Sequence, residues 1–196
     1  MKKARNLFDT GRIHVTTMKL KIGDQAPPFH VLNLVGADLT VPTGQWIHLQ
    51  FRRFAGCPIC NLHLRSFVRQ ADRLNASGIH EIVVFHSSRE AMRPYFNDLP
   101  FDSVGDPDKI LYERYGVEES PKAKASLKAV EAALKGMLIT KPTTKVEGGT
   151  NGLPADFLID PSGRIVALKY GQHAADHWEV DELLALKAKF ANPVAA

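Results

Sequence analysis

The sequence predicts an α/β fold in which helices flank a central mixed sheet. Three observations lead to this prediction. The segments alternate between strand and helix, an order that requires parallel neighbours in the sheet. Two strands joined by a turn follow at 155–170 and add an antiparallel pair. The 196 residues are 44% hydrophobic and 23% charged, which is sufficient for one domain with a full core.

The start of the chain predicts an arm followed by a ribbon. Residues 1–18 lack apolar periodicity, so we expect a flexible arm, then a single domain at 19–190 and a tail at 191–196. A Pro-Pro break and a short apolar stretch at 30–35 indicate an extra N-terminal ribbon rather than a central strand. The basic N-terminus lacks the apolar core of a signal peptide, and no run of about 18 apolar residues occurs. We therefore expect a cytoplasmic protein without a membrane span.

Two strands and the helix between them form the predicted centre of the domain. Trp46–Arg52 is typical of a buried strand. Pro58 suits the first turn of a helix, which we expect over 58–74, ending before Gly78. The β-branched run at 80–86 is too short to favour a helix, and it predicts a parallel strand beside the first.

Shorter elements continue the alternation. Ser87 with Glu90 three residues later forms a capping-box pattern and predicts a short helix to about Asn97. An extended piece ends at 104–106, and 108–115 predicts a turn or two of helix. The strand pair of the last third spans Ala155–Tyr170, and a closing helix is expected over 177–190.

Residues 118–150 interrupt this order, and we interpret them as a helical insertion followed by a loop. The insertion carries large apolar residues at helical spacing, namely Leu127, Val130, Leu134 and Met137 or Leu138. The simplest interpretation is a helix packed on the domain surface. A lid over the site and a dimer contact are the alternatives.

The chain has two cysteines, Cys57 and Cys60, placed between the first buried strand and the helix that follows it. At a helix N-terminus, free N–H groups and the helix dipole favour a thiolate. Residues three apart on a helix have Cβ atoms about 5–6 Å apart, close enough for a disulfide. We expect Cys57, nearer the loop and more exposed, to be the nucleophile and Cys60 to resolve the oxidised form. Arg52 or Arg53 adds positive charge, but strand alternation lets only one face the thiolate.

Two stretches carry a resemblance to a known family. The segment FRRFAGCPIC from Phe51 and the segment GLPADFLIDPSGRIV from Gly152 resemble the thioredoxin fold. They are more narrowly similar to the AhpC/TSA peroxiredoxin-like family, in its branch with a Cys-Pro-x-Cys pair, over about residues 19–190. The resemblance implies an antioxidant thiol oxidoreductase that reduces peroxides or disulfides through a reversible Cys57–Cys60 disulfide. It also implies recycling by a thioredoxin system or glutathione, no cofactor, and a possible homodimer.

The chain departs from the familiar peroxiredoxin pattern in two places. Peroxiredoxins place Thr or Ser three residues before the reactive cysteine and Pro seven before it, where this chain has Phe54 and Gln50. Their arginine at the entry to the later strand pair is replaced by Pro154. In thioredoxins that position is a cis-proline facing the cysteines, so we expect a cis Pro154 and a Leu153 backbone that pairs with substrate. Phe54 either lines the cysteine pocket or fills core.

Other functions compete with redox chemistry. Cys57, Cys60 and His63 could bind zinc or copper, although the sequence offers no evident fourth ligand. The cysteines could also be two small buried hydrophobic residues. The net charge of +4 comes from scattered basic residues, so we expect no nucleic-acid partner. The prediction is a thiol-disulfide oxidoreductase with Cys57 and Cys60 as catalytic residues and with Arg53, Phe54, Leu153 and Pro154 contacting substrate.

Overall fold

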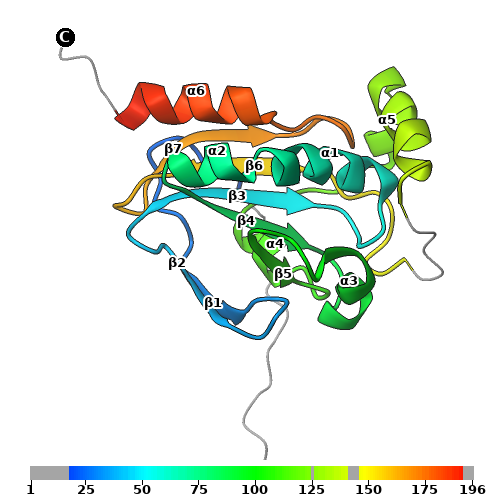
Figure 1. Ribbon diagram of the computed structural model, residues 1–196, viewed down its shortest axis with the longest axis horizontal. Helices are drawn as coiled ribbons and strands as arrows, with labels where there is room; N and C mark the ends of the chain where they lie inside the picture. The colour runs from blue at the N-terminus through cyan, green and yellow to red at the C-terminus, as the bar shows by residue number, and fades with distance from the viewer. Residues whose placement is uncertain (1–17, 125, 141–145, 192–196) are drawn as a thin grey trace, which may run out of the picture.

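A five-stranded mixed sheet organises the computed structural model, which describes residues 18–124, 126–140 and 146–191 (Figure 1). Its strand order is β5-β4-β3-β6-β7. The central strands β3 and β4 are parallel, as are β4 and β5, whereas β6 is antiparallel to both β3 and β7. The strands are β3 (Trp46–Arg52), β4 (Ile79–Phe85), β5 (Asp102–Gly105), β6 (Ala155–Ile159) and β7 (Ile165–Tyr170). The mixed α/β sheet is as predicted.

The predicted N-terminal ribbon is present as a separate antiparallel pair, β1 (Phe29–Leu32) and β2 (Asp38–Val41). The chain around it bonds to both edges of the main sheet. Leu34 donates its N–H to Ser103 of β5 at 2.8 Å, and Asp24 accepts from Ile165 of β7 at 2.9 Å. Of the expected arm at 1–18 only Met18 is among the described residues. Of the expected tail at 191–196 only Ala191 is described, and it is the last residue of the final helix.

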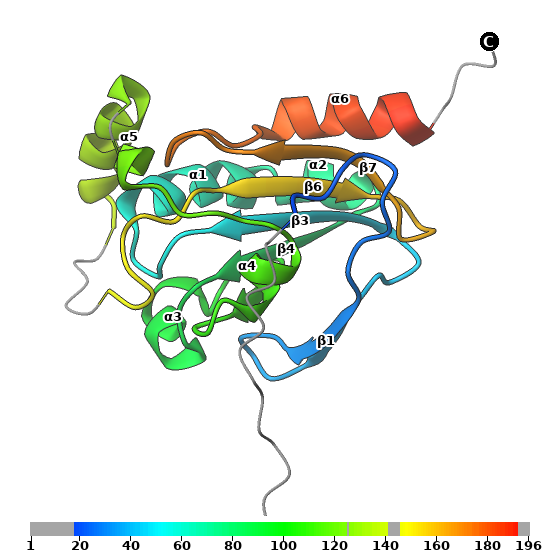
Figure 2. The ribbon, with the colours of Figure 1, turned by 180° about the vertical axis from the view of Figure 1, so that it is seen from behind.

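Helices cover the two faces of the sheet unequally. Figures 1 and 2 show α1 (Pro58–Arg69), α2 (Ala71–Ala76) and α6 (Val180–Ala191) on one face. The ribbon and α4 (Ile110–Arg114) lie on the other. The single helix predicted over 58–74 is wrong, because the backbone leaves helical geometry at Gln70, with φ −114° and ψ 16°.

The helix α3 (Arg89–Phe96) begins one residue later than predicted. Ser88, not Ser87, caps it, accepting a hydrogen bond from Ala91 N–H at 3.3 Å. Ser87 is buried, and its hydroxyl accepts from Ala55 N–H at 2.9 Å. Ser87 therefore ties the end of β4 to the loop that carries the cysteines.

The insertion contains a short 3₁₀ turn (Pro121–Lys124) and α5 (Leu127–Met137), so the predicted helix is confirmed. Its orientation is the reverse of the one its apolar pattern suggests. The large side chains are exposed, whereas the small ones pack inward: Ala129, Ala132, Ala133 and Gly136. Across the described parts of the chain, no helix has the length and apolar character needed to cross a membrane.

Strand β3 separates two kinds of interior. Ile47, Leu49 and Phe51 point into an apolar core on the ribbon side. The residues between them are polar, yet His48, Gln50 and Arg52 are also buried. Because strand side chains alternate between faces, these three share one side, and contacts with Phe67 and His63 show that it is the side of α1.

Candidate active site

The cysteine pair sits at the start of α1, directly after the loop that leaves β3. Cys57 is the N-cap residue, with extended backbone (φ −62°, ψ 118°), and Pro58 begins the helix. The Cys57 N–H donates to the Phe54 carbonyl at 3.1 Å, and the Cys57 carbonyl accepts from Asn61 N–H at 2.9 Å. Both cysteines are free thiols. The strand-to-helix placement predicted for the pair is confirmed.

Both thiols are buried. Cys57 is 0% exposed and Cys60 is 2% exposed. The prediction that Cys57 is the more exposed is therefore wrong. The pair shares an apolar cluster with Phe54 of its own loop, Ala129 of α5 and Ala174. The inserted helix thus contributes to the burial, which a sequence without tertiary contacts could not indicate.

Arg53 is the arginine that faces the pair. Its Nη1 donates to Cys57 Sγ at 3.6 Å, and its Nη2 donates to the Thr150 carbonyl. Arg52 turns to the opposite side, toward Asp156 and His63. As strand alternation predicts, the two guanidinium groups have separate surroundings, and one of them lies against the cysteines.

One of the two neighbouring thiols loses its proton more readily than the other. Burial and the hydrogen bond to Cys60 raise the pKa of the Cys57 thiol. Burial acts against ionisation of Cys60 too, but the hydrogen bond from Cys57 and the charge of Arg53 lower its pKa to about 7. A coupled pair of this kind ionises once near neutral pH, with the thiolate shared between two sulfurs. The site is therefore electrostatically suited to thiolate chemistry.

Hydrogen bonds hold segment 146–153 beside Arg53. The Glu147 carboxylate accepts from Ser88 N–H at 2.6 Å, and the Glu147 carbonyl accepts from His86 Nδ1 at 3.2 Å. A Cβ at Gly148 would lie 2.3 Å from His86 Nδ1. Burial lowers the pKa of His86 to about 4. His86 is thus a neutral ring that supports the segment bonded to Arg53.

Two of the predicted substrate contacts need correction. The one cis peptide bond among the described residues precedes Pro42, so the bond before Pro154 is trans and the prediction of a cis Pro154 is wrong. The Leu153 N–H already donates to the Glu118 carbonyl at 3.1 Å, and the Pro154 carbonyl accepts from Gly171 at 2.8 Å. These backbone groups are not available to pair with substrate, because the insertion and the chain after β7 occupy them.

Phe54 is placed beside the cysteines. It is buried in their apolar cluster. The Arg53 guanidinium lies over its ring, 5.4 Å from the centroid. Phe54 thus fills core around the pair and also positions the cation that contacts Cys57.

Beneath α1 lies a buried ionic network that the sequence analysis missed. His48 Nδ1 is 2.8 Å from a Glu81 carboxylate oxygen, and its Nε2 is 3.1 Å from Asp156. Arg52 Nη2 donates to the same Asp156 oxygen at 2.6 Å. All four side chains are at most 3% exposed. The visible signal was the polar alternation of His48, Gln50 and Arg52 within an apolar strand.

The members of this network stabilise one another in their charged forms. Burial acts to lower the pKa of His48, yet Glu81 and Asp156 raise it to about 9. Burial acts to raise the pKa of Asp156, but Arg52 and His48 keep it far below its usual value. Arg52 also helps to lower the pKa of Cys60. A charge from strand β3 therefore affects the ionisation of Cys60 in α1.

We expect the stability of the protein to fall as the pH rises from 6.5 to 9. The imidazolium of His48 stabilises the fold fully below its unfolded pKa of about 6.5, and this stabilisation is lost as the pH rises through the folded pKa of about 9. The shift corresponds to about 3 kcal/mol of unfolding free energy. Urea denaturation of a Cys57→Ser/Cys60→Ser protein, which lacks the thiol ionisation, measures the unfolding free energy at each pH. Adding His48→Gln should remove the dependence of this free energy on pH. An unfolding free energy that does not change with pH while His48 is present would contradict the prediction.

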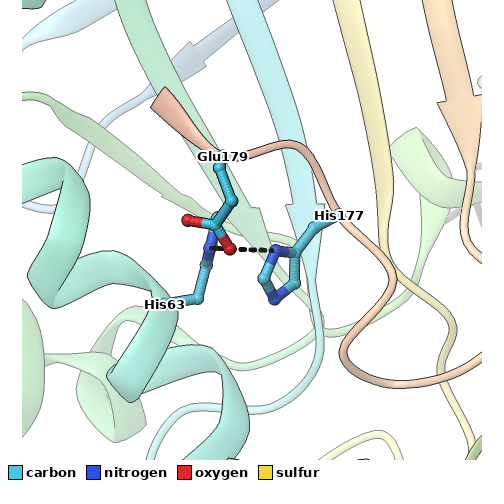
Figure 3. A group of neighbouring side chains, drawn as sticks. All are labelled: His63, His177 and Glu179. Carbon is cyan, nitrogen blue, oxygen red and sulfur yellow. Dashed lines mark ion pairs between the residues drawn. The ribbon is translucent and has the colours of Figure 1, made fainter. Parts of the chain in front are cut away.

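One group of side chains resembles a metal site. Figure 3 shows that His63 and His177 both point toward Glu179. Their Nδ1 atoms lie 3.9 and 3.7 Å from the Glu179 carboxylate oxygen. This is the one group of metal-ligand type found in the described residues, and it contains neither Cys57 nor Cys60. The predicted alternative ligand set of both cysteines with His63 is therefore not assembled.

The hydrogen bonding of His63 argues against metal binding by this group. Arg52 Nη2 lies 3.1 Å from His63 Nε2. A guanidinium can only donate, so Nε2 supplies the lone pair and Nδ1 of the neutral ring carries the hydrogen. Burial keeps the pKa of His63 well below its usual value, so the ring stays neutral. Its Nδ1 therefore directs a hydrogen, not a lone pair, at Glu179.

Several solved structures are similar to this protein in fold. The fold is similar to that of the peroxidoxin BcpB from Mycobacterium tuberculosis, with a TM-score of 0.65 and 13% identity over 90% of this chain and 99% of that one. It is similar to Mycobacterium bovis AhpC, with a TM-score of 0.64 and 16% identity over 91% and 97% of the two chains. It is also similar to a putative thiol:disulfide interchange protein DsbE from Chlorobium tepidum, with a TM-score of 0.57 and 21% identity over 88% of this chain and 99% of that one.

These likenesses establish a thioredoxin-like fold. No curated protein matches the sequence. The sequence itself matches the AhpC/TSA family over residues 22–168, a range that contains the cysteine pair, Arg53 and Asp156. This chain belongs to the AhpC/TSA family.

Proposed function

We propose that this protein is a thiol oxidoreductase that reduces peroxides or disulfides through a reversible Cys57–Cys60 disulfide. The observation that carries the proposal is the contact of Arg53 Nη1 with Cys57 Sγ at 3.6 Å, within a dithiol at a helix N-terminus. Cations and helix N-termini both favour the thiolate that attacks. Membership of the AhpC/TSA family supports redox chemistry of this general kind.

With a peroxide as oxidant, the Cys57 thiolate attacks one peroxide oxygen and the O–O bond breaks. The second oxygen leaves as an alkoxide, takes up a proton and becomes an alcohol or water, while Cys57 becomes a sulfenic acid. The Cys60 thiolate then attacks the Cys57 sulfur and expels hydroxide, which a proton converts to water, and the disulfide forms. Arg53 stabilises the first thiolate and the oxygen that leaves.

With a disulfide as oxidant, the same residues act without oxygen chemistry. The Cys57 thiolate attacks one sulfur and releases the other as a thiolate, and Cys60 displaces the remaining half from Cys57. In both cases two thiols of a reductant restore the pair and leave as a disulfide. A thioredoxin system or glutathione as that reductant, a homodimer and a cytoplasmic location remain parts of the proposal.

The first test is to follow the thiols of reduced protein during exposure to hydrogen peroxide and, separately, to a small disulfide. We expect loss of both thiols per chain and an intact mass lower by two hydrogen atoms. Thiol titration and mass spectrometry measure these changes, with Cys57→Ser/Cys60→Ser protein as the control for other oxidation. Unchanged thiols with both oxidants, and a metal retained in the starting protein, would contradict the proposal.

A further inference from the structure

The inserted helix α5 lies across the start of α1, where Cys57 is. Figure 1 shows α5 at the end of the domain at which α1 begins. Ala129 of α5 belongs to the apolar cluster that encloses both cysteines. The helix is therefore in position to control what reaches the Cys57 sulfur.

Gly136 makes this close approach possible. A Cβ at position 136 would lie 2.1 Å from the Pro58 carbonyl oxygen and 2.5 Å from its carbonyl carbon. Both atoms are backbone atoms of the residue that follows Cys57, so neither can move aside as a flexible side chain would. Glycine is about 1 kcal/mol less favourable than alanine inside a helix. Helix formation therefore does not explain Gly136, whereas the contact with Pro58 does.

Small side chains and two hydrogen bonds from the flanking chain hold α5 in this position. Beyond the Gly136 contact, Arg65 of α1 donates to the Ile139 carbonyl at 2.9 Å, and Ala174 donates to the Ala123 carbonyl at 2.7 Å. The large apolar side chains of α5 are between 49% and 89% exposed and add little to its buried contact with α1: Leu127, Val130, Leu134 and Met137. A helix held mainly by small residues is displaced by a modest steric change.

We propose that α5 restricts Cys57 to small oxidants and that Gly136 determines this specificity. The inference rests on the proposed function and names its substrate class. Attack on a disulfide requires the incoming sulfur, with its attached carbon, to approach to about the 2.05 Å length of an S–S bond. Cys57 is 0% exposed in the cluster to which α5 contributes Ala129, so either oxidant needs a local opening to reach its sulfur. Hydrogen peroxide, which has no substituents, needs only a small opening, whereas a bulky disulfide needs α5 to move away from α1.

The test replaces Gly136 by alanine in the full chain. The added Cβ cannot fit against the Pro58 backbone, so α5 should lift and expose Cys57. Stopped-flow measurements give the rates of thiol loss with hydrogen peroxide and with the disulfide dithionitrobenzoate. We expect the disulfide rate to rise about tenfold or more, as overpacking of this size shifts a local equilibrium, while the peroxide rate changes by less than about threefold. Lys128→Ala, on the exposed side of the same helix, should leave both rates unchanged.

The outcomes separate this inference from the proposed function. Equal disulfide-to-peroxide rate ratios in wild type and Gly136→Ala protein would overturn the role of α5. Failure of the wild type to react with either oxidant would instead overturn the proposed function. Arg65→Ala, which removes the contact with Ile139, should shift the ratio in the same direction by a smaller factor. It decides the matter if circular dichroism shows that Gly136→Ala protein does not fold.

Discussion

Cys57→Ser protein should lose peroxide and disulfide turnover completely. Serine keeps the size of cysteine but gives no thiolate near neutral pH, and Cys60 alone cannot form the intramolecular disulfide that the catalytic cycle requires. Since enzymes accelerate reactions by about a millionfold or more, we expect a loss of at least about a thousandfold in kcat/KM. A coupled assay with excess reductant measures it. Cys57→Ser protein that keeps full activity would show that the roles assigned to the two cysteines are wrong.

Cys60→Ser protein should stop at a different point. Cys57 can still attack, but nothing resolves the product, so hydrogen peroxide should leave a sulfenic acid and a small disulfide should leave an adduct on Cys57. Intact mass after trapping with dimedone detects the first, and intact mass alone detects the second. The comparison of the two variants tests which sulfur attacks the oxidant, because the pKa of Cys60 is about 7 whereas that of Cys57 is raised. Trapping on Cys60 in Cys57→Ser protein, and not on Cys57, would reverse the assignment.

Asp156→Asn should produce the largest loss of stability. The carboxylate bonds both Arg52 and His48, and all three side chains are at most 1% exposed. Removing the negative charge leaves two buried cations with one fewer partner, a change that typically costs about 3–5 kcal/mol. Urea denaturation of the variant measures the loss.

The matched control is Asp181→Asn, which removes a carboxylate from an exposed pair. Asp181 lies 2.8 Å from Arg73, with a side chain that is 80% exposed. Exposed pairs contribute about 0–1 kcal/mol, so this variant should unfold close to the wild-type midpoint. Equal midpoints for Asp156→Asn and wild type would mean that Asp156 does not stabilise the buried charges.

The elements that bring the cysteines to a helix start were predictable because their signals are local. An apolar run predicts β3, Pro58 predicts the first turn of α1, and the turn between 160 and 163 predicts the antiparallel pair. The face of α5 was not predictable in this way. Its large apolar residues suggested the buried side, but the contact with Pro58 selects the small ones.

The ionic network depends on strand register, which the sequence does not reveal. His48 lies opposite Glu81 in β4, and Gln50 lies opposite Asp156 in β6. Each pair joins residues more than thirty positions apart, and a shift of one residue would send the side chains to the other face. The polar alternation in β3 could have indicated buried partners, but not which ones.

The site around Pro154 was mispredicted for a related reason. The resemblance implied free backbone at Leu153, yet the insertion forms an isolated bridge between Glu119 and Gly152 and bonds Glu118 to Leu153. An insertion that pairs with the chain entering β6 changes what that chain can bind. Family likeness alone carries no information about such a local addition.

The N-terminal ribbon has a consequence for assembly. An outer strand of a sheet offers unpaired N–H and C=O groups, onto which another polypeptide can add as a further strand. Here the stretch from Asp24 to Leu34 occupies such groups on both outer strands, at Ile165 of β7 and at Ser103 of β5. Copies of this chain are thereby hindered from joining into one continuous sheet at these positions. The homodimer that we propose would instead be expected to form through helices, and α5 presents the exposed apolar side chains for such a contact.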